Sequence, residues 1–152
     1  LLLLTTGCGY QVHRQSSLPF TEIYIAPIVN KTLEPKLQDR LHRALTEEFV
    51  KQGFSIRNGA PYRLTGTVSR FDLYALSSKK GVTVDYRVVI HGVFNLTGPD
   101  GKIVATKEFS GPFIVTVSGS ENLAELLAAK ENAEDTACRD IALQVAGALI
   151  YR

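Results

Sequence analysis

The stretch that decides the fold is residues 82–97, with the sequence VTVDYRVVIHGVFNLT. Its apolar residues alternate with polar ones, which is the period of a β-strand that has one buried face and one solvent-facing face. The residues predicted to face the core are Val82, Val84, Tyr86, Val88, Ile90, Phe94 and Leu96, and those predicted to face outward are Thr83, Asp85, Arg87 and His91. A long strand with one polar face is typical of an antiparallel sheet.

The segments on either side continue the same two-residue period. Residues 62–75 alternate until the phase shifts, which predicts a β-bulge near Ser69 and Arg70. The loop at 77–81 then makes the two long segments a hairpin. A turn signal at 98–101 leads to a third strand, and residues 113–117 either add a fourth strand or extend the third.

Two segments have helical periodicity instead. An apolar stripe at three- and four-residue spacing predicts a helix over 35–52, with Pro35 in its first turn and Gly53 after its end. The charged residues of this helix alternate in sign, which favours a solvated outer face. Ala133 and Ala137 begin a second stripe, in a helix expected over about 122–151.

A short β-branched segment at 23–29 precedes these elements and completes the order β-α-β-β-β-α. We therefore predict an α+β fold: an antiparallel, mixed-edge sheet of about four strands with two amphipathic helices packed on one face.

Composition and motifs exclude several classes of function. The chain has 152 residues, which suits a single domain, and its net charge of +2 gives no argument for a nucleic-acid ligand. The sequence has no run of about 18 apolar residues, no nucleotide-binding or nucleophile motif, and three scattered histidines without metal-ligand spacing. We predict no catalytic residue, no metal, no resident cofactor and no enzymatic activity.

The first residues are typical of an export signal. Four leucines are followed by Thr5, Thr6 and Gly7 directly before Cys8, as in a bacterial lipoprotein cleavage site, although Thr5 stands where leucine is usual. We expect residues 1–7 to be a signal-peptide remnant, Cys8 the anchor carrying diacylglycerol and N-acyl lipid, residues 8–20 a linker, and residues 21–152 one domain. Two alternatives stay open: a buried strand with Cys8 in the core, or a disulfide between Cys8 and Cys138.

Positive charge is concentrated in the predicted meander. Residues 57–107 hold eight Lys and Arg against three Asp, a net charge of +5, whereas residues 121–152 have a net charge of −3. The predicted outward face has Arg63, Arg87, His91 and Lys102 among threonines, which would suit phosphate or sugar groups. The same residues are also common on any solvent-facing antiparallel strand, so both interpretations stay open.

Several segments taken together resemble one known family. They are Cys8-Gly9-Tyr10, Leu18-Pro19, residues 30–35 (NKTLEP), Gly81 with residues 85–87 (DYR), and the alanine-rich last helix. In order and spacing they are similar to the lipopolysaccharide-assembly lipoproteins of the LptE family, over nearly the whole chain.

The resemblance implies a non-enzymatic, Gram-negative outer-membrane lipoprotein. It would sit inside the β-barrel of an LptD-type partner in a 1:1 complex, help that barrel assemble, and assist the insertion of lipopolysaccharide into the outer leaflet. Gly9 after the anchor cysteine is consistent with outer-membrane sorting. The residues that would contact the lipid A phosphates are Lys79 and Lys80, which match a basic loop of the family, followed by Arg87, Arg70 and Arg63.

Two other classes of function are weighed against this one. A generic periplasm-facing lipoprotein would use the same fold as a structural partner or pilot of another envelope complex. A small secreted hydrolase or lipid-transfer domain would need a nucleophile with its base or a deep apolar cavity, and the sequence indicates neither.

Overall fold

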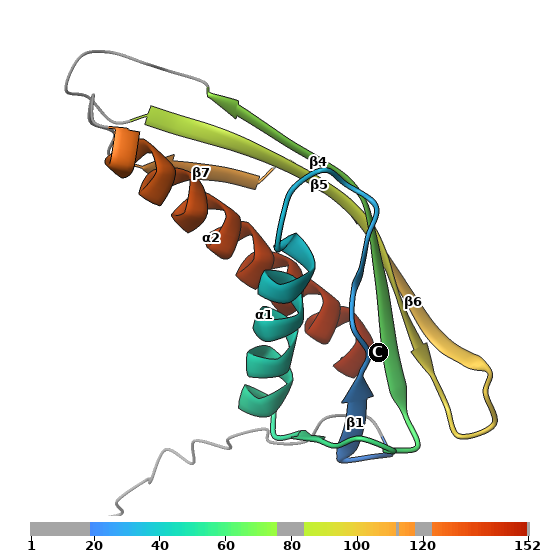
Figure 1. Cartoon of the computed structure of the whole chain (residues 1–152). Coiled ribbons are helices and arrows are strands. Elements are labelled where there is room, and N and C mark those ends of the chain that lie inside the picture. Colours follow the sequence, from blue (N-terminus) through green and yellow to red (C-terminus); the bar gives the residue numbers. More distant parts are fainter. Residues whose placement is uncertain (1–18, 76–83, 112, 118–122, 152) are drawn as a thin grey trace, which may run out of the picture.

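The computed structural model describes residues 19–75, 84–111, 113–117 and 123–151. Its helices lie in one layer on one face of a curved sheet (Figure 1). In chain order the elements are β1 (Glu22–Ile25), β2 (Val29–Asn30), α1 (Leu37–Lys51), β3 (Ser55–Ile56), β4 (Arg63–Ala75), β5 (Val84–Thr97), β6 (Ile103–Ser110), β7 (Phe113–Val117) and α2 (Leu123–Ile150). The predicted α+β class and the arrangement of both helices on one face are confirmed.

The sheet has seven strands in the described residues, in the order β3-β1-β4-β5-β6, with β2 also on β4 and β7 also on β5. The number exceeds the predicted four for two reasons. The segment predicted at 23–29 is divided into β1 and β2 around Pro27, whose nitrogen has no hydrogen to donate to a ladder. The other reason is the two-residue strand β3, which pairs in parallel with β1.

Strand β5 is the centre of the sheet. It pairs antiparallel with β4 along one edge, and along the other edge with β7 over its first residues and β6 over its last. Residues 113–117 therefore form a separate strand that shares an edge of β5 with β6. The predicted bulge is confirmed, because the β4–β5 register shifts between Val68 and Arg70.

The alternation predicted for the central strand is also confirmed where its side chains are described. Val88, Ile90, Phe94 and Leu96 are buried against the helix layer, while Arg87 is exposed on the opposite face. Val82 and the side chains of Val84 and Tyr86 lie outside the described part of the chain.

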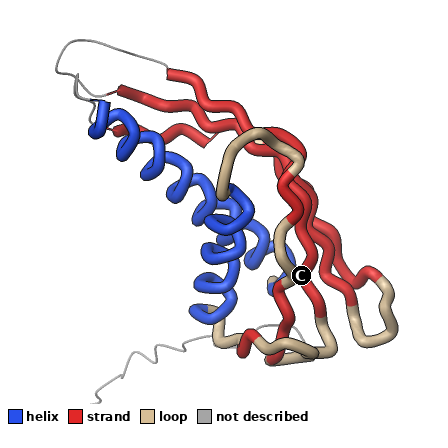
Figure 2. The backbone as a smooth tube through the Cα atoms, viewed as in Figure 1, coloured by secondary structure: helices blue, strands red, loops and turns tan. Residues whose placement is uncertain are grey.

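Helix α1 begins later than predicted. The backbone of Lys36 is left-handed, with φ of 62°, so Pro35 lies in the preceding loop rather than in the first helical turn. The predicted stripe is nevertheless correct, since Leu37, Leu41 and Leu45 are fully buried. Figure 2 shows α1 crossing α2 on the same side of the sheet.

Helix α2 presents small residues to its neighbours. Ala133 and Ala137, predicted to face the core, are fully buried, as is Ile141. Because alanine has a short side chain, α2 can approach both α1 and the sheet closely. None of the described helices is both long and apolar enough to cross a membrane.

One close approach requires glycine. A Cβ atom built on Gly66 of β4 would lie 2.3 Å from Cε1 of Phe94 and 2.9 Å from Cδ1 of Ile28, both of which are buried. Glycine at this position lets the Phe94 ring lie directly on the backbone of β4.

We predict that Gly66→Ala lowers the free energy of unfolding by about 1–3 kcal/mol, because the new methyl group overpacks the core. The matched control is Gly147→Ala in α2, where an added Cβ meets nothing within 4 Å. The control should be neutral or stabilising by up to about 1 kcal/mol, since alanine favours helix. Urea unfolding followed by circular dichroism measures both, and equal effects in the two variants would contradict the packing argument.

Candidate functional site

The outer face of the sheet, on the side away from the helices, holds the three predicted arginines that the structure describes. Arg63 and Arg70 lie on β4 and Arg87 on β5, and all three are exposed. Their cross-strand neighbours are Thr97 for Arg63, His91 for Arg70 and Tyr74 for Arg87. Along an extended strand, seven residues span roughly 20 Å, so the arginines are spread along the face and do not converge on one point.

Two of these charges already have partners. Arg70 forms an ion pair with Asp72, and this contact raises the pKa of the Arg70 guanidinium. The guanidinium of Arg63 lies 5.2 Å from the centre of the Tyr24 ring, a cation–π contact. Arg87 makes no ion pair with any residue in the described ranges, so its charge is the freest of the three.

The other predicted residues are placed less fully. Lys79, Lys80 and Cys8 lie outside the described residues, so their roles stay predictions. Lys102, predicted on the outer face, instead lies in the turn before β6, where its ammonium group is 3.8 Å from Asp100. His91 is on the outer face, as predicted.

A hollow lies next to the bulge and has a volume of about 410 Å³. It is lined by Ser69, His91, Gly92, Val93, Glu108, Phe109 and Ser110. The hydroxyl, imidazole and carboxylate groups can exchange hydrogen bonds with a hydroxyl-rich or charged ligand. Of these residues the sequence singled out only His91 and, as part of the bulge, Ser69, because the others come together through strand pairing.

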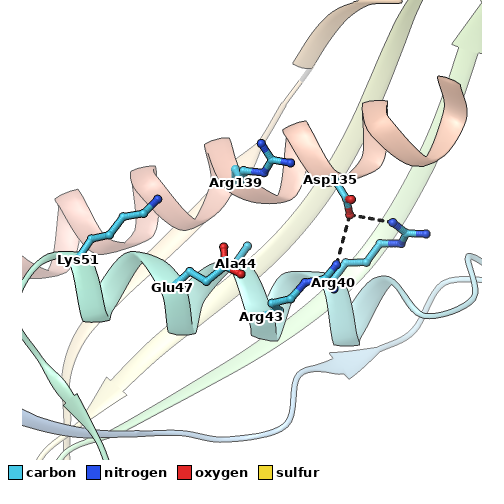
Figure 3. A pocket seen from close by; sticks show the side chains of 7 residues that line it. All are labelled: Arg40, Arg43, Ala44, Glu47, Lys51, Asp135 and Arg139. Carbon is cyan, nitrogen blue, oxygen red and sulfur yellow. Dashed lines mark hydrogen bonds and ion pairs between the residues drawn. The ribbon is translucent and has the colours of Figure 1, made fainter. Parts of the chain in front are cut away.

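The second hollow is a groove between the two helices, and sequence reasoning missed it. It has a volume of about 410 Å³ and is polar; Figure 3 shows the residues that line it. They are Arg40, Arg43, Ala44, Glu47, Lys51, Asp135 and Arg139.

Arg40 is the centre of an ionic network at one end of this groove. Its Nη1 atom donates a hydrogen bond to Oδ1 of Asp135 at 2.7 Å, and its Nε atom lies 3.5 Å from Oε2 of Glu134. The Arg40 side chain is only 17% exposed. The prediction of a solvated outer face for this helix is therefore wrong at Arg40, because α2 covers it.

Glu134 carries the network to the loop before α1. Its residue is 2% exposed, and its Oε1 atom lies 3.4 Å from Nζ of Lys130, which in turn bonds to Oε1 of Glu34 at 2.9 Å. Burial raises the pKa of the Glu134 carboxyl, with a further contribution from Glu34, while Lys130 and Arg40 oppose the rise. The sequence carried one signal of this arrangement: Glu134 stands directly beside the alanines of the buried stripe, four residues after Lys130.

Cys138 is a core residue with a free thiol. Burial raises its pKa to about 12, so at neutral pH it is the uncharged thiol, which is a poor nucleophile. Its position in the packed face of α2 therefore accounts for it without a chemical role.

The fold is one that several bacterial lipoproteins share. A protein from Caulobacter crescentus has a similar structure, with 19% identity, a TM-score of 0.56 and coverage of 80% of this chain and 83% of that one. The PelC dodecamer from Paraburkholderia phytofirmans matches with 14% identity, a TM-score of 0.54 and coverage of 87% and 89%. A minor lipoprotein from Acinetobacter baumannii matches with 9% identity, a TM-score of 0.53 and coverage of 84% and 89%. These low identities establish the fold alone.

The sequence is more specific. The model of the LptE family, described as lipopolysaccharide-assembly, matches residues 20–149, and this chain belongs to that family. No curated protein sequence matches the chain significantly.

We predict that Arg40→Gln lowers the free energy of unfolding by about 3 kcal/mol at neutral pH, because it leaves the buried carboxylate of Glu134 without one of its counter-charges. The matched control is Arg43→Gln, one turn further along α1, whose side chain is 63% exposed and lies 3.7 Å from Asp135. Exposed ion pairs contribute at most about 1 kcal/mol. Chemical unfolding of both variants would refute the argument if Arg40→Gln cost no more than Arg43→Gln.

Proposed function

We propose that this protein is the lipoprotein that plugs and supports an LptD-type β-barrel in a 1:1 complex, assisting both the assembly of the barrel and the insertion of lipopolysaccharide into the outer leaflet. The observation that carries the proposal is the LptE family match, which covers residues 20–149 and so includes every described strand and nearly all of the final helix. The proposed role is mechanical and involves no catalysis.

The proposal includes the membrane attachment. Cys8 carries the lipid in the mature protein, residues 1–7 are removed with the signal peptide, and residues 8–20 link the anchor to the domain at 21–152. The anchor holds the domain on the periplasmic side of the outer membrane, where it can enter the barrel. Acyl chains contribute roughly 0.8 kcal/mol per buried methylene, which makes such an anchor stable.

The proposed lipopolysaccharide contacts follow from the charges of the outer face. Arg87 lies near the start of β5 and makes no ion pair within the described ranges, and Lys79 and Lys80 precede it in the sequence. These three residues are the first candidates for lipid A phosphates. Arg70 and Arg63 come second, because Asp72 and the Tyr24 ring already contact them.

The first experiment is purification of the full-length, acylated protein from outer membranes in mild detergent, with mass spectrometry of what remains bound. We expect an LptD-type barrel at equal stoichiometry. Recovery of the lipoprotein alone, of a ring of identical copies, or of another envelope machine would reject the barrel role and favour a structural partner or pilot of a different complex.

The lipopolysaccharide contacts are tested by the triple variant Lys79→Ala, Lys80→Ala, Arg87→Ala. We expect its affinity for purified lipopolysaccharide to fall at least about tenfold and to depend less on salt, because exposed charge pairs each contribute up to about 1 kcal/mol and are screened by ions. Arg70→Gln is the comparison, and a smaller loss is expected because Asp72 already neutralises that charge. Unchanged binding by the triple variant would remove these residues from the site.

A further inference from the structure

The loop between β2 and α1 presents an apolar side chain to solvent. Leu33 is completely exposed, more so than any other large hydrophobic residue in the described part of the chain, and Val29, four residues earlier, is 51% exposed. Figure 2 shows this loop arching from the sheet to the start of α1. The loop belongs to the NKTLEP segment, to which the proposed function assigns no role.

The loop is held in one shape by its own side chains. Asn30 accepts hydrogen bonds at Oδ1 from the backbone nitrogen of Thr32 at 2.9 Å and from the Thr32 hydroxyl at 2.7 Å. Its Nδ2 atom donates to the carbonyl oxygen of Glu34 at 2.8 Å and to Oε1 of Gln38 at 3.0 Å. Asn30 therefore fixes both sides of the leucine and ties the loop to the first turn of α1.

Two further contacts fix the loop to the body of the domain. The Glu34 carboxylate bonds to Lys130 of α2, so the ionic network around Glu134 extends to the residue next to Leu33. At the far end, the left-handed backbone of Lys36 turns the chain into the helix. An L-residue other than glycine adopts this conformation at a cost, and surrounding structure must maintain it.

A fixed geometry around an exposed leucine favours a protein partner with a matching recess. A side chain that is already held in position loses little conformational freedom on binding, which increases affinity. Insertion into a lipid surface would gain little from such fixation. Lys31 and Lys36 are exposed on either side and make no ion pair with any described residue, which favours acidic groups around the recess.

We propose that Leu33 is an apolar anchor that inserts into an apolar recess on the barrel partner, with Lys31 and Lys36 facing acidic side chains at its rim. This inference rests on the proposed function and names the part of the surface that holds the partner.

The test is co-purification of the barrel with Leu33→Ser in the full-length, acylated protein. We expect the recovered barrel to fall about tenfold relative to the wild type. The control is Leu143→Ser on α2, which removes an equally large apolar side chain that is 56% exposed and should leave recovery unchanged. Both variants should unfold at the wild-type denaturant concentration, because neither removes a buried group. Lys31→Glu should also reduce recovery, by repulsion from the acidic rim.

A photo-crosslinking amino acid at position 33, with position 143 as the comparison, identifies the occupant in living cells. A crosslink from position 33 to the barrel supports the proposal. A crosslink only to lipid or to a second copy of this chain, or no crosslink, overturns it. If the wild type recovers the barrel and Leu33→Ser recovers as much, the anchor fails alone; if the wild type recovers no barrel, the proposed function fails and the anchor with it.

Discussion

The register of β5 is the constraint on which the rest of the structure depends. This strand pairs with β4 on one edge and with β7 and β6 on the other, so the long strands are all aligned through it. Its side chains alternate between faces, and a slip of one residue would expose Val88, Ile90 and Phe94 to solvent. The apolar face fixed in this way is what the helices cover, and the opposite face receives the polar side chains.

The second constraint is the buried carboxylate of Glu134. A charge in this position is costly, and it is tolerated because Arg40 comes from α1 and Lys130 from one turn earlier in α2. Apolar packing alone would let two alanine-rich surfaces slide against each other, whereas a buried charge with two partners allows a single alignment. Since Lys130 also binds Glu34, the position of α2 is transmitted to the loop before α1.

The sequence predicted those features that depend on local periodicity. The bulge near Ser69 and the buried positions of β5 both follow from the two-residue pattern, and the stripes of both helices follow from the helical one. The errors arise where tertiary contacts override local signals. Pro35 indicated the start of a helix, but the left-handed backbone of Lys36 delays it. Likewise, Arg40 belongs to an alternating charged face that sequence alone assigns to solvent, and only the packing of α2 buries it.

The candidate sites show the same division. The sequence correctly placed Arg63 and Arg87 on one polar face, because alternation determines which face a residue occupies. It did not reveal that Asp72 pairs with Arg70 or that Tyr24 lies beneath Arg63, since these contacts depend on side-chain conformations and strand neighbours. The result is a face whose free charge is smaller than its composition suggests. In a domain whose hollows are shallow and polar, binding must be distributed over surfaces. A rigid scaffold is then needed to keep distant contacts in register, and the β5 ladder together with the Glu134 network supplies it.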